Sequence, residues 1–206
     1  MKMMTLFNTN SKNGIVLPTE EQLQQLSCAS SYGKSLNKQS LTQELLDCAI
    51  KDAARFYDTL VELPFIFNYD WRVKSEQSIR LKYAKGLKSG LRFNTVFNDL
   101  IGLRIKVQEY PDSYPDYFRV VDMRNGKKNY DGYRAVHLYY KLDNFHYQVE
   151  IQLWSDADYT FNDWSHTYGY KTLDNSSLAL LRERCDSGEL KTREDFRKAV
   201  IGYETK

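Results

Sequence analysis

The chain has 206 residues, of which 42% are hydrophobic and 27% are charged. These proportions are typical of a folded globular domain, and they exclude a disordered chain or one built on membrane spans. The 29 Lys and Arg residues nearly balance the 27 Asp and Glu residues, so a polyanion must be bound by a local cluster of cations. The three cysteines include no CxxC pair, which favours neither a disulfide framework nor a zinc site and indicates the cytoplasm.

The first third of the chain predicts an arm followed by a helix and a strand. Residues 1–17 are polar and aperiodic, which indicates a flexible arm. A helix is expected over 40–63, with Ser40 as its N-cap and Pro64 closing it. The aromatic run over 65–71 favours a strand.

The rest of the chain predicts a mixed sheet flanked by helices. A short helix is expected over 75–85, ended by Gly86. Two strands and then a hairpin across 143–144 follow, and the last part of the chain is helical. The strands are predicted over 100–107, 117–123, 135–142 and 145–153, and the helices over 156–170, 176–185 and 192–201.

Residues 72–92 concentrate positive charge in a chain that is almost neutral. Seven cations face a single acid, Glu76, within this stretch. Cations at the start of a helix that follows a strand are typical of a phosphate site, because helix amide groups converge there with the side chains. A solvated helix face is the alternative. The cations are Arg72, Lys74, Arg80, Lys82, Lys85, Lys88 and Arg92.

Two acids occupy strand positions. Asp99 directly precedes the apolar strand at 100–107. Within the strand at 145–153, alternation places Glu150 and Gln152 on the face opposite the apolar residues. Carboxylates on a sheet can hold Mg²⁺ and bridge it to substrate phosphates. A turn residue at Asp99 and a solvent-facing residue at Glu150 are the alternatives.

Five short segments stand out when they are taken in chain order: RVKSEQSIRLK (72–82), DLIGLRI (99–105), GYRAVH (132–137), VEIQ (149–152), and WSH with YK (164–171). Together they resemble the RelA/SpoT synthetase family over residues 65–171, and the chain is similar to the small, single-domain members. One domain would span 1–206, with C-terminal helices over 176–206. The resemblance implies an α+β fold with a mixed, mostly antiparallel five-stranded sheet flanked by helices. It also implies a pyrophosphokinase that moves the β,γ-pyrophosphate of ATP to a ribose 3′-hydroxyl and releases AMP.

The resemblance also implies roles on the ATP side of the reaction. Arg72 and Arg104 would sandwich the adenine. Three further residues would hold the ATP phosphates, namely Lys74, Ser78 and Lys82. Asp99 would bind Mg²⁺, the implied cofactor, and Glu150 would share the metal or accept the proton of the attacking hydroxyl.

On the acceptor side, the chain departs from the family members that use guanosine nucleotides. Asn129 and Asp131 replace a lysine and an asparagine of their loop, and Trp154 stands where an arginine often follows. Tyr133 would stack on the acceptor base. The lost cations favour the 3′ CCA end of tRNA as acceptor, as in translation-inhibiting toxins of the family, over GTP or GDP. The candidate acceptor-binding residues are Tyr133, Lys127, Lys128, Arg134, His137 and Gln152.

Two functions of other classes stay open. One is a nucleotidyltransferase that transfers a nucleoside monophosphate, and the other is a nucleotide- or RNA-binding module without catalysis. The expected partners are ATP and either tRNA or a guanine nucleotide, with no membrane. The toxin interpretation adds a neutralising antitoxin protein, and an oligomer is compatible with the small relatives.

Overall fold

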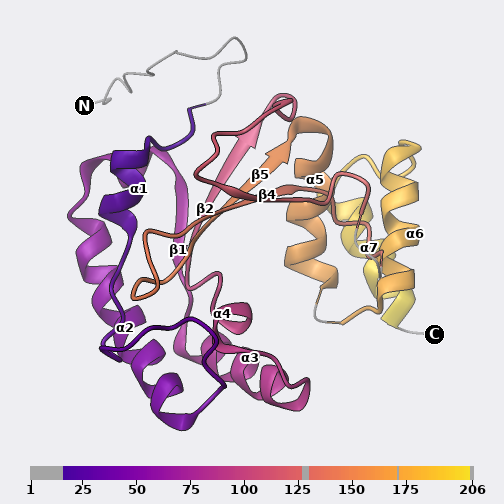
Figure 1. The fold of residues 1–206 in the computed structure, drawn as a ribbon. Coiled ribbons are helices and arrows are strands. Elements are labelled where there is room, and N and C mark those ends of the chain that lie inside the picture. Colours follow the sequence, from indigo (N-terminus) through magenta and orange to yellow (C-terminus); the bar gives the residue numbers. More distant parts are fainter. Residues whose placement is uncertain (1–15, 127–129, 171, 205–206) are drawn as a thin grey trace. The chain divides into compact units, whose positions relative to one another are not determined.

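A computed structural model describes residues 16–126, 130–170 and 172–204. It has an α+β fold whose five-stranded, mostly antiparallel sheet is flanked by helices, in the strand order β1-β2-β5-β4-β3 (Figure 1). The predicted fold class is therefore confirmed. The helices are α1 (Glu20–Leu26), α2 (Gln43–Val61), α3 (Glu76–Lys88), α4 (Phe93–Val96), α5 (Asp156–Trp164), α6 (Asn175–Asp186) and α7 (Arg193–Glu204). The strands are β1 (Asp70–Val73), β2 (Ile101–Val107), β3 (Arg119–Asp122), β4 (Val136–Tyr140) and β5 (Val149–Ser155).

The chain divides into two compact units. The first comprises Met1–Ile105, Ser113–Val120 and Leu138–Gln152, and the second comprises Lys106–Asp112, Val121–His137 and Leu153–Lys206. None of the described helices is both long and apolar enough to cross a membrane.

The core of the first unit is built around α2. Its buried residues recur at helical spacing, and Phe56 packs edge to face on Tyr147 with the ring centroids 5.4 Å apart. The Tyr147 hydroxyl donates to Asp52, a fully buried carboxylate of α2 (3.0 Å). Asp52 also accepts from the backbone N–H of Ser31 (2.8 Å), so the segment before α2 is tied to the helix. A buried acid satisfied in this way holds the helix in one position.

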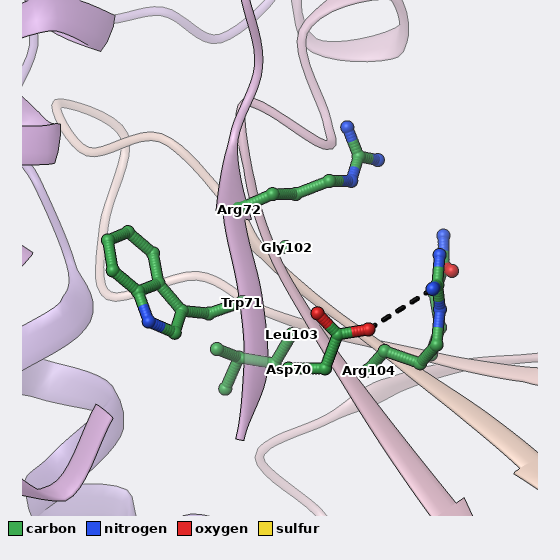
Figure 2. A pocket seen from close by; sticks show the side chains of 7 residues that line it. Asp70, Trp71, Arg72, Gly102, Leu103 and Arg104 are labelled. Atoms are coloured by element: carbon green, nitrogen blue, oxygen red, sulfur yellow. Dashed lines mark hydrogen bonds and ion pairs between the residues drawn. The ribbon is translucent and has the colours of Figure 1, made fainter. Parts of the chain in front are cut away.

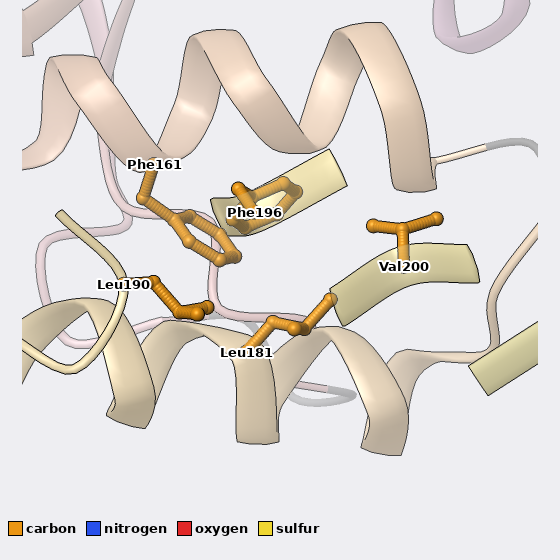
Figure 3. Close-up of a cluster of buried hydrophobic side chains, with 5 residues drawn as sticks. All are labelled: Phe161, Leu181, Leu190, Phe196 and Val200. Carbon is orange, nitrogen blue, oxygen red and sulfur yellow. The ribbon is translucent and has the colours of Figure 1, made fainter. Parts of the chain in front are cut away.

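The core of the second unit lies among α5, α6 and α7. Figure 3 shows five buried apolar side chains that meet between these helices and their connections: Phe161, Leu181, Leu190, Phe196 and Val200. The rings of Phe161 and Phe196 meet edge to face at 5.9 Å. This apolar cluster gives the second unit a hydrophobic core of its own.

The predicted N-terminal helix begins later than expected. Thr42, not Ser40, is the N-cap of α2, because its hydroxyl accepts from the backbone N–H of Leu45 (3.2 Å). Ser40 instead forms an isolated bridge with Arg92. The short helix α1 was not predicted at all, although Thr19 and Gln22 form a capping box at its start.

Two further expectations were wrong in detail. The stretch predicted as a strand over 65–71 is mostly a 3₁₀ helix, Pro64–Asn68, and the strand covers only Asp70–Val73. Gly86 does not end α3, which continues to Lys88. A Cβ at Gly86 would lie 2.5 Å from Cγ2 of Val96, so close packing against α4 explains this glycine. The helix instead ends before Gly90, which has a φ of +61°.

The tight hairpin predicted across 143–144 is wrong, because β4 ends at Tyr140 and β5 begins only at Val149. The remaining predicted elements agree with the structure to within three residues. The helix expected over 156–170 ends its α-helical part at Trp164, and a π-helical turn, Ser165–Gly169, continues it. Most of the predicted arm over 1–17 lies outside the described residues.

Candidate active site

The cationic cluster is built at the turn from β1 into α3, in the first unit. Lys74 follows β1, and Lys82 lies two turns into α3. Both amines bind Asp99: Lys74 contacts Oδ2, and Lys82 donates to Oδ1 at 2.7 Å. Lys82 also donates to Oδ1 of Asn98 (3.1 Å). Asp99 therefore has a cation on each carboxylate oxygen.

Arg72 links Asp99 to Glu150. Its Nη2 atom lies 3.7 Å from Oδ2 of Asp99 and 3.8 Å from Oε2 of Glu150. Because one nitrogen is close to both carboxylates, the two acids meet at one place on the sheet. The structure thus brings together the two acids and three of the cations that the sequence singled out, all within the first unit.

Charge and burial oppose one another at this cluster. Burial alone would raise the pKa of the Asp99 carboxyl, but the charges and hydrogen bonds of Lys82 and Lys74 lower it below its usual value. Burial, together with the charges of Lys82 and Arg72, lowers the pKa of the Lys74 amine although Asp99 acts in the other direction. The aspartate is therefore held ionised.

A pocket lies beside this cluster, between two guanidinium groups. In the antiparallel register, Arg72 pairs with Gly102 and Asp70 with Arg104, so these four residues share one face. The Arg72 side chain lies over Gly102, where a Cβ would be 3.5 Å from its Nε. Figure 2 shows this pocket and the ion pair from Arg104 Nη1 to Asp70 Oδ2 (3.1 Å). The lining residues are Asp70, Trp71, Arg72, Gly102, Leu103, Arg104 and Gln152.

The pocket suits a flat aromatic ring. Two guanidinium groups on one sheet face can stack on a π-system, and the absence of a side chain at Gly102 lets the Arg72 side chain lie close against the sheet. Gln152, which the sequence placed with the acceptor, lines this pocket together with Arg72 and Arg104. The assignment of Gln152 to the acceptor therefore stays a prediction. Its position in this pocket also suits contact with the base of a nucleotide.

Glu150 is buried, with 4% of its surface exposed, so the alternative of a solvent-facing strand residue is wrong. Its Oε1 accepts from the Tyr139 hydroxyl (2.9 Å), and its Oε2 accepts from Nε2 of Gln152 (2.9 Å). Tyr139 was missed by the sequence reading. Only its position in a predicted strand beside that of Glu150 could have suggested the contact.

The residues present fit a magnesium ion. Asp99 and Glu150 supply hard carboxylate oxygens at one place, and Mg²⁺ commonly takes one or two carboxylates together with substrate phosphates. Within residues 16–126, 130–170 and 172–204, no group of three or more His, Cys, Asp and Glu side chains is placed to hold a metal. A metal here would therefore depend on the ligands of a bound nucleotide.

Ser78 lies in the first turn of α3, at the exposed N-terminal end of the helix. Ser75 caps this end, accepting from the backbone N–H of Ser78 (3.4 Å) and donating to its hydroxyl (3.0 Å). The amide groups of this first turn and the adjacent Lys74 together favour an anion. The predicted phosphate role of Ser78 is compatible with this place.

Three predicted acceptor residues, Tyr133, Arg134 and His137, lie in the second unit. Tyr133 and His137 form an aromatic cluster with Trp154. The indole Nε1 of Trp154 donates to the Tyr133 hydroxyl (3.0 Å), which is also 2.8 Å from Nε2 of His137. Asp131 accepts from the backbone N–H of Tyr133 (3.1 Å), which fixes the turn before it. The tyrosine is half-buried and held at its hydroxyl end.

The cations of this unit are largely compensated. Arg134 lies 3.4 Å from Asp186 and donates to the Tyr130 hydroxyl at 3.0 Å. Arg182 is 2% exposed and pairs with Asp158 (2.7 Å). Lys127 and Lys128 lie outside the described residues. A basic RNA-binding surface therefore does not include Arg182.

Comparisons with known proteins were made for the whole chain. No family model matches it, and no curated protein matches it. Among solved structures, small alarmone synthetase 1 from Bacillus subtilis has 20% identity over 79% of this chain and 94% of that chain, with a TM-score of 0.41. Small alarmone synthetase 2 from Bacillus subtilis has 24% identity over 78% of this chain and 97% of that chain, with a TM-score of 0.41.

A third such structure is a GTP pyrophosphokinase family protein from Streptococcus pneumoniae, with 19% identity over 77% of this chain and 97% of that chain and a TM-score of 0.40. This chain is similar to small alarmone synthetases.

Proposed function

We propose that the protein is a pyrophosphokinase that transfers the β,γ-pyrophosphate of ATP to a ribose 3′-hydroxyl. The observation that carries the proposal is the convergence of Arg72 on both Asp99 and Glu150, beside a pocket that Arg72 and Arg104 line. A triphosphate needs cations and a metal site next to a site for its base, and this arrangement supplies all three.

On the donor side, Arg72 and Arg104 hold the adenine between them. Lys74, Lys82 and the start of α3 bind the phosphates, whose negative charge replaces that of Asp99 as the partner of the lysines. Asp99 would hold Mg²⁺, which when bound neutralises charge on the phosphates, and this leaves Glu150 as the proton acceptor. These residues position the triphosphate and exclude alternative orientations.

In the transfer, the 3′-oxygen of the acceptor attacks the β-phosphorus of ATP. The bond from that phosphorus to the oxygen bridging to the α-phosphorus breaks, and AMP leaves with that oxygen. The hydroxyl proton passes to the carboxylate of Glu150. Lys74, Lys82 and Arg72 offset the negative charge on the transferred group.

For the acceptor, we favour the 3′-terminal adenosine of tRNA, which makes the protein an inhibitor of translation. Tyr133 would stack on the acceptor base, and its hydroxyl is held by Trp154, which cannot bind a phosphate as an arginine would. Arg134 is compensated by Asp186. The described part of the acceptor loop thus suits a stacked base better than the phosphates of a free nucleotide. A guanine nucleotide, giving an alarmone, is the second candidate, supported by the same donor site.

The test incubates the protein with ATP labelled in its γ-phosphate, together with bulk tRNA, GDP or GTP. Release of AMP with the label on tRNA is expected. Label on guanine nucleotides alone would replace the preferred acceptor by the second candidate. Release of pyrophosphate in place of AMP would indicate a nucleotidyltransferase, and absence of turnover with every acceptor would contradict the proposed function. The Asp99→Asn variant serves as the inactive control.

A further inference from the structure

Each oxygen of the Glu150 carboxylate receives a hydrogen bond from an uncharged donor. Tyr139, on β4, donates to Oε1, and Gln152, two residues along β5, donates to Oε2, both at 2.9 Å. The rotation of the carboxylate about its last bond is thereby fixed from both sides.

Tyr139 is itself held in place. It is 8% exposed, and the guanidinium of Arg119, on β3, lies 4.2 Å from its ring centre. Burial first, and then the charge of Glu150 and the hydrogen bond to it, raise the pKa of the Tyr139 hydroxyl far above its usual value. At 2.9 Å from Oε1 of Glu150, the hydroxyl is the donor, because an ionised carboxylate oxygen can only accept. Three neighbouring strands, β3, β4 and β5, thus form a chain of contacts that ends on the carboxylate.

The neutrality of these two donors distinguishes Glu150 from Asp99. Two lysines bond directly to Asp99, whereas the hydrogen bonds to Glu150 come from a phenol and an amide, and the Arg72 guanidinium stays 3.8 Å from its Oε2. A phenol and an amide orient a carboxylate without neutralising its charge. A group that accepts a proton from a hydroxyl needs that charge and a fixed direction of approach.

We propose that Tyr139 is a positioning residue that fixes the Glu150 carboxylate in the orientation needed for proton acceptance during transfer. The proposal rests on the proposed function. The alternative is a purely structural tyrosine whose hydroxyl donates to the nearest buried acceptor. The two differ in their effect on the rate of the folded enzyme.

The first experiment compares the kinetics of Tyr139→Phe with those of the wild type. Removing the hydroxyl leaves one carboxylate oxygen without its orienting donor, and we expect kcat to fall about tenfold or more. The KM for ATP should change by less than about twofold, because the base slot and the phosphate-binding lysines are untouched. A structural role would instead lower the melting temperature and leave kcat per folded molecule unchanged.

Tyr140→Phe is the matched control. Tyr140 is the next residue of β4, is 4% exposed, and hydrogen-bonds Gln24 of α1. The Tyr140→Phe variant loses the same hydroxyl group from the same strand, and we expect its kcat to equal that of the wild type. An unchanged kcat in Tyr139→Phe, with a wild type that releases AMP, would overturn this proposal alone. A wild type without turnover would overturn it together with the proposed function.

A second measurement does not require the Tyr139→Phe variant to be active. The protein is labelled with 3-fluorotyrosine at its 16 tyrosines, and the ¹⁹F resonance absent from Tyr139→Phe identifies Tyr139. In Glu150→Gln this resonance should shift, while that of Tyr140 should stay in place. If Tyr139→Phe fails to fold, single-site incorporation at position 139 gives the same assignment. A Tyr139 resonance that is indifferent to Glu150→Gln would overturn the proposal.

Discussion

The two groups of predicted site residues are built on different chemistry. Around Asp99, in the first unit, cations and carboxylates meet directly, and both Arg72 and Lys82 remain partly exposed. Around Tyr133, in the second unit, rings and neutral hydrogen bonds dominate, and the nearby Arg134 pairs with Asp186. The first arrangement suits a polyphosphate, whose charge can displace the internal partners. The second suits an uncharged aromatic base.

Changing Asp99 should have the largest effect. Asp99→Asn keeps the shape of the side chain but loses the charge that would bind Mg²⁺, and turnover should fall about 100-fold or more, since metal contributions amount to several kcal/mol. The measurement is AMP release from ATP, with circular dichroism to confirm folding.

Asp58→Asn, an exposed change on α2, is the control and should retain wild-type activity. Substantial turnover in Asp99→Asn would show that the charged cluster around Asp99 is not the polyphosphate site.

Changing Tyr133 tests the aromatic half. Tyr133→Ala should lower kcat/KM for the acceptor by an amount corresponding to about 1–3 kcal/mol, the usual contribution of one stacked base. The KM for ATP should not change. Tyr133→Phe keeps the ring and should lose much less. Equal losses in both variants would show that the hydroxyl, and not stacking, matters at this position.

Filling the slot between the guanidinium groups should raise the KM for ATP. A leucine at Gly102 would displace the Arg72 side chain that lies over it, and we expect an increase of about tenfold, the equivalent of one lost favourable contact. Gly102→Ala is the matched control, because its Cβ would lie at an ordinary contact distance of 3.5 Å from Nε of Arg72. A normal KM in Gly102→Leu would place the adenine elsewhere.

The smallest effect is expected at Trp154. Trp154→Phe retains an aromatic ring but loses the hydrogen bond to the Tyr133 hydroxyl, which is usually worth about 1 kcal/mol. The KM for the acceptor should rise about fivefold, as measured by acceptor titration at saturating ATP. A larger change in the KM for ATP than for the acceptor would contradict the assignment of this cluster to the acceptor.

Local sequence patterns predicted much of this fold, but not what depends on tertiary contacts. Alternation correctly placed Glu150 and Gln152 on one face of a strand, and both reach the same cluster or its pocket. Gly86 was misjudged, because a glycine required by packing against Val96 looks the same in sequence as one that ends a helix. The N-cap of α2 was misplaced because Ser40 and Thr42 are both capping residues. The strand at 65–71 was overpredicted because aromatic residues follow one another there.

The candidate site shows the same limit. Arg72, Lys74 and Lys82 stood out by charge, but their convergence on Asp99 depends on how β1 and α3 pack beside β2. The contact of Tyr139 with Glu150 depends on the register between β4 and β5, which no local pattern contains. Residue types thus indicated candidate site residues, whereas the contacts between these residues became known only from the structure.

The two lysines on Asp99 imply an order of events. A divalent ion arriving alone meets a carboxylate that is already neutralised on both oxygens, so its affinity for the empty protein should be low. A polyphosphate draws Lys74 and Lys82 to itself and releases the carboxylate, so nucleotide and metal should each strengthen the binding of the other. With such coupling, binding of the polyphosphate would have to precede binding of the metal.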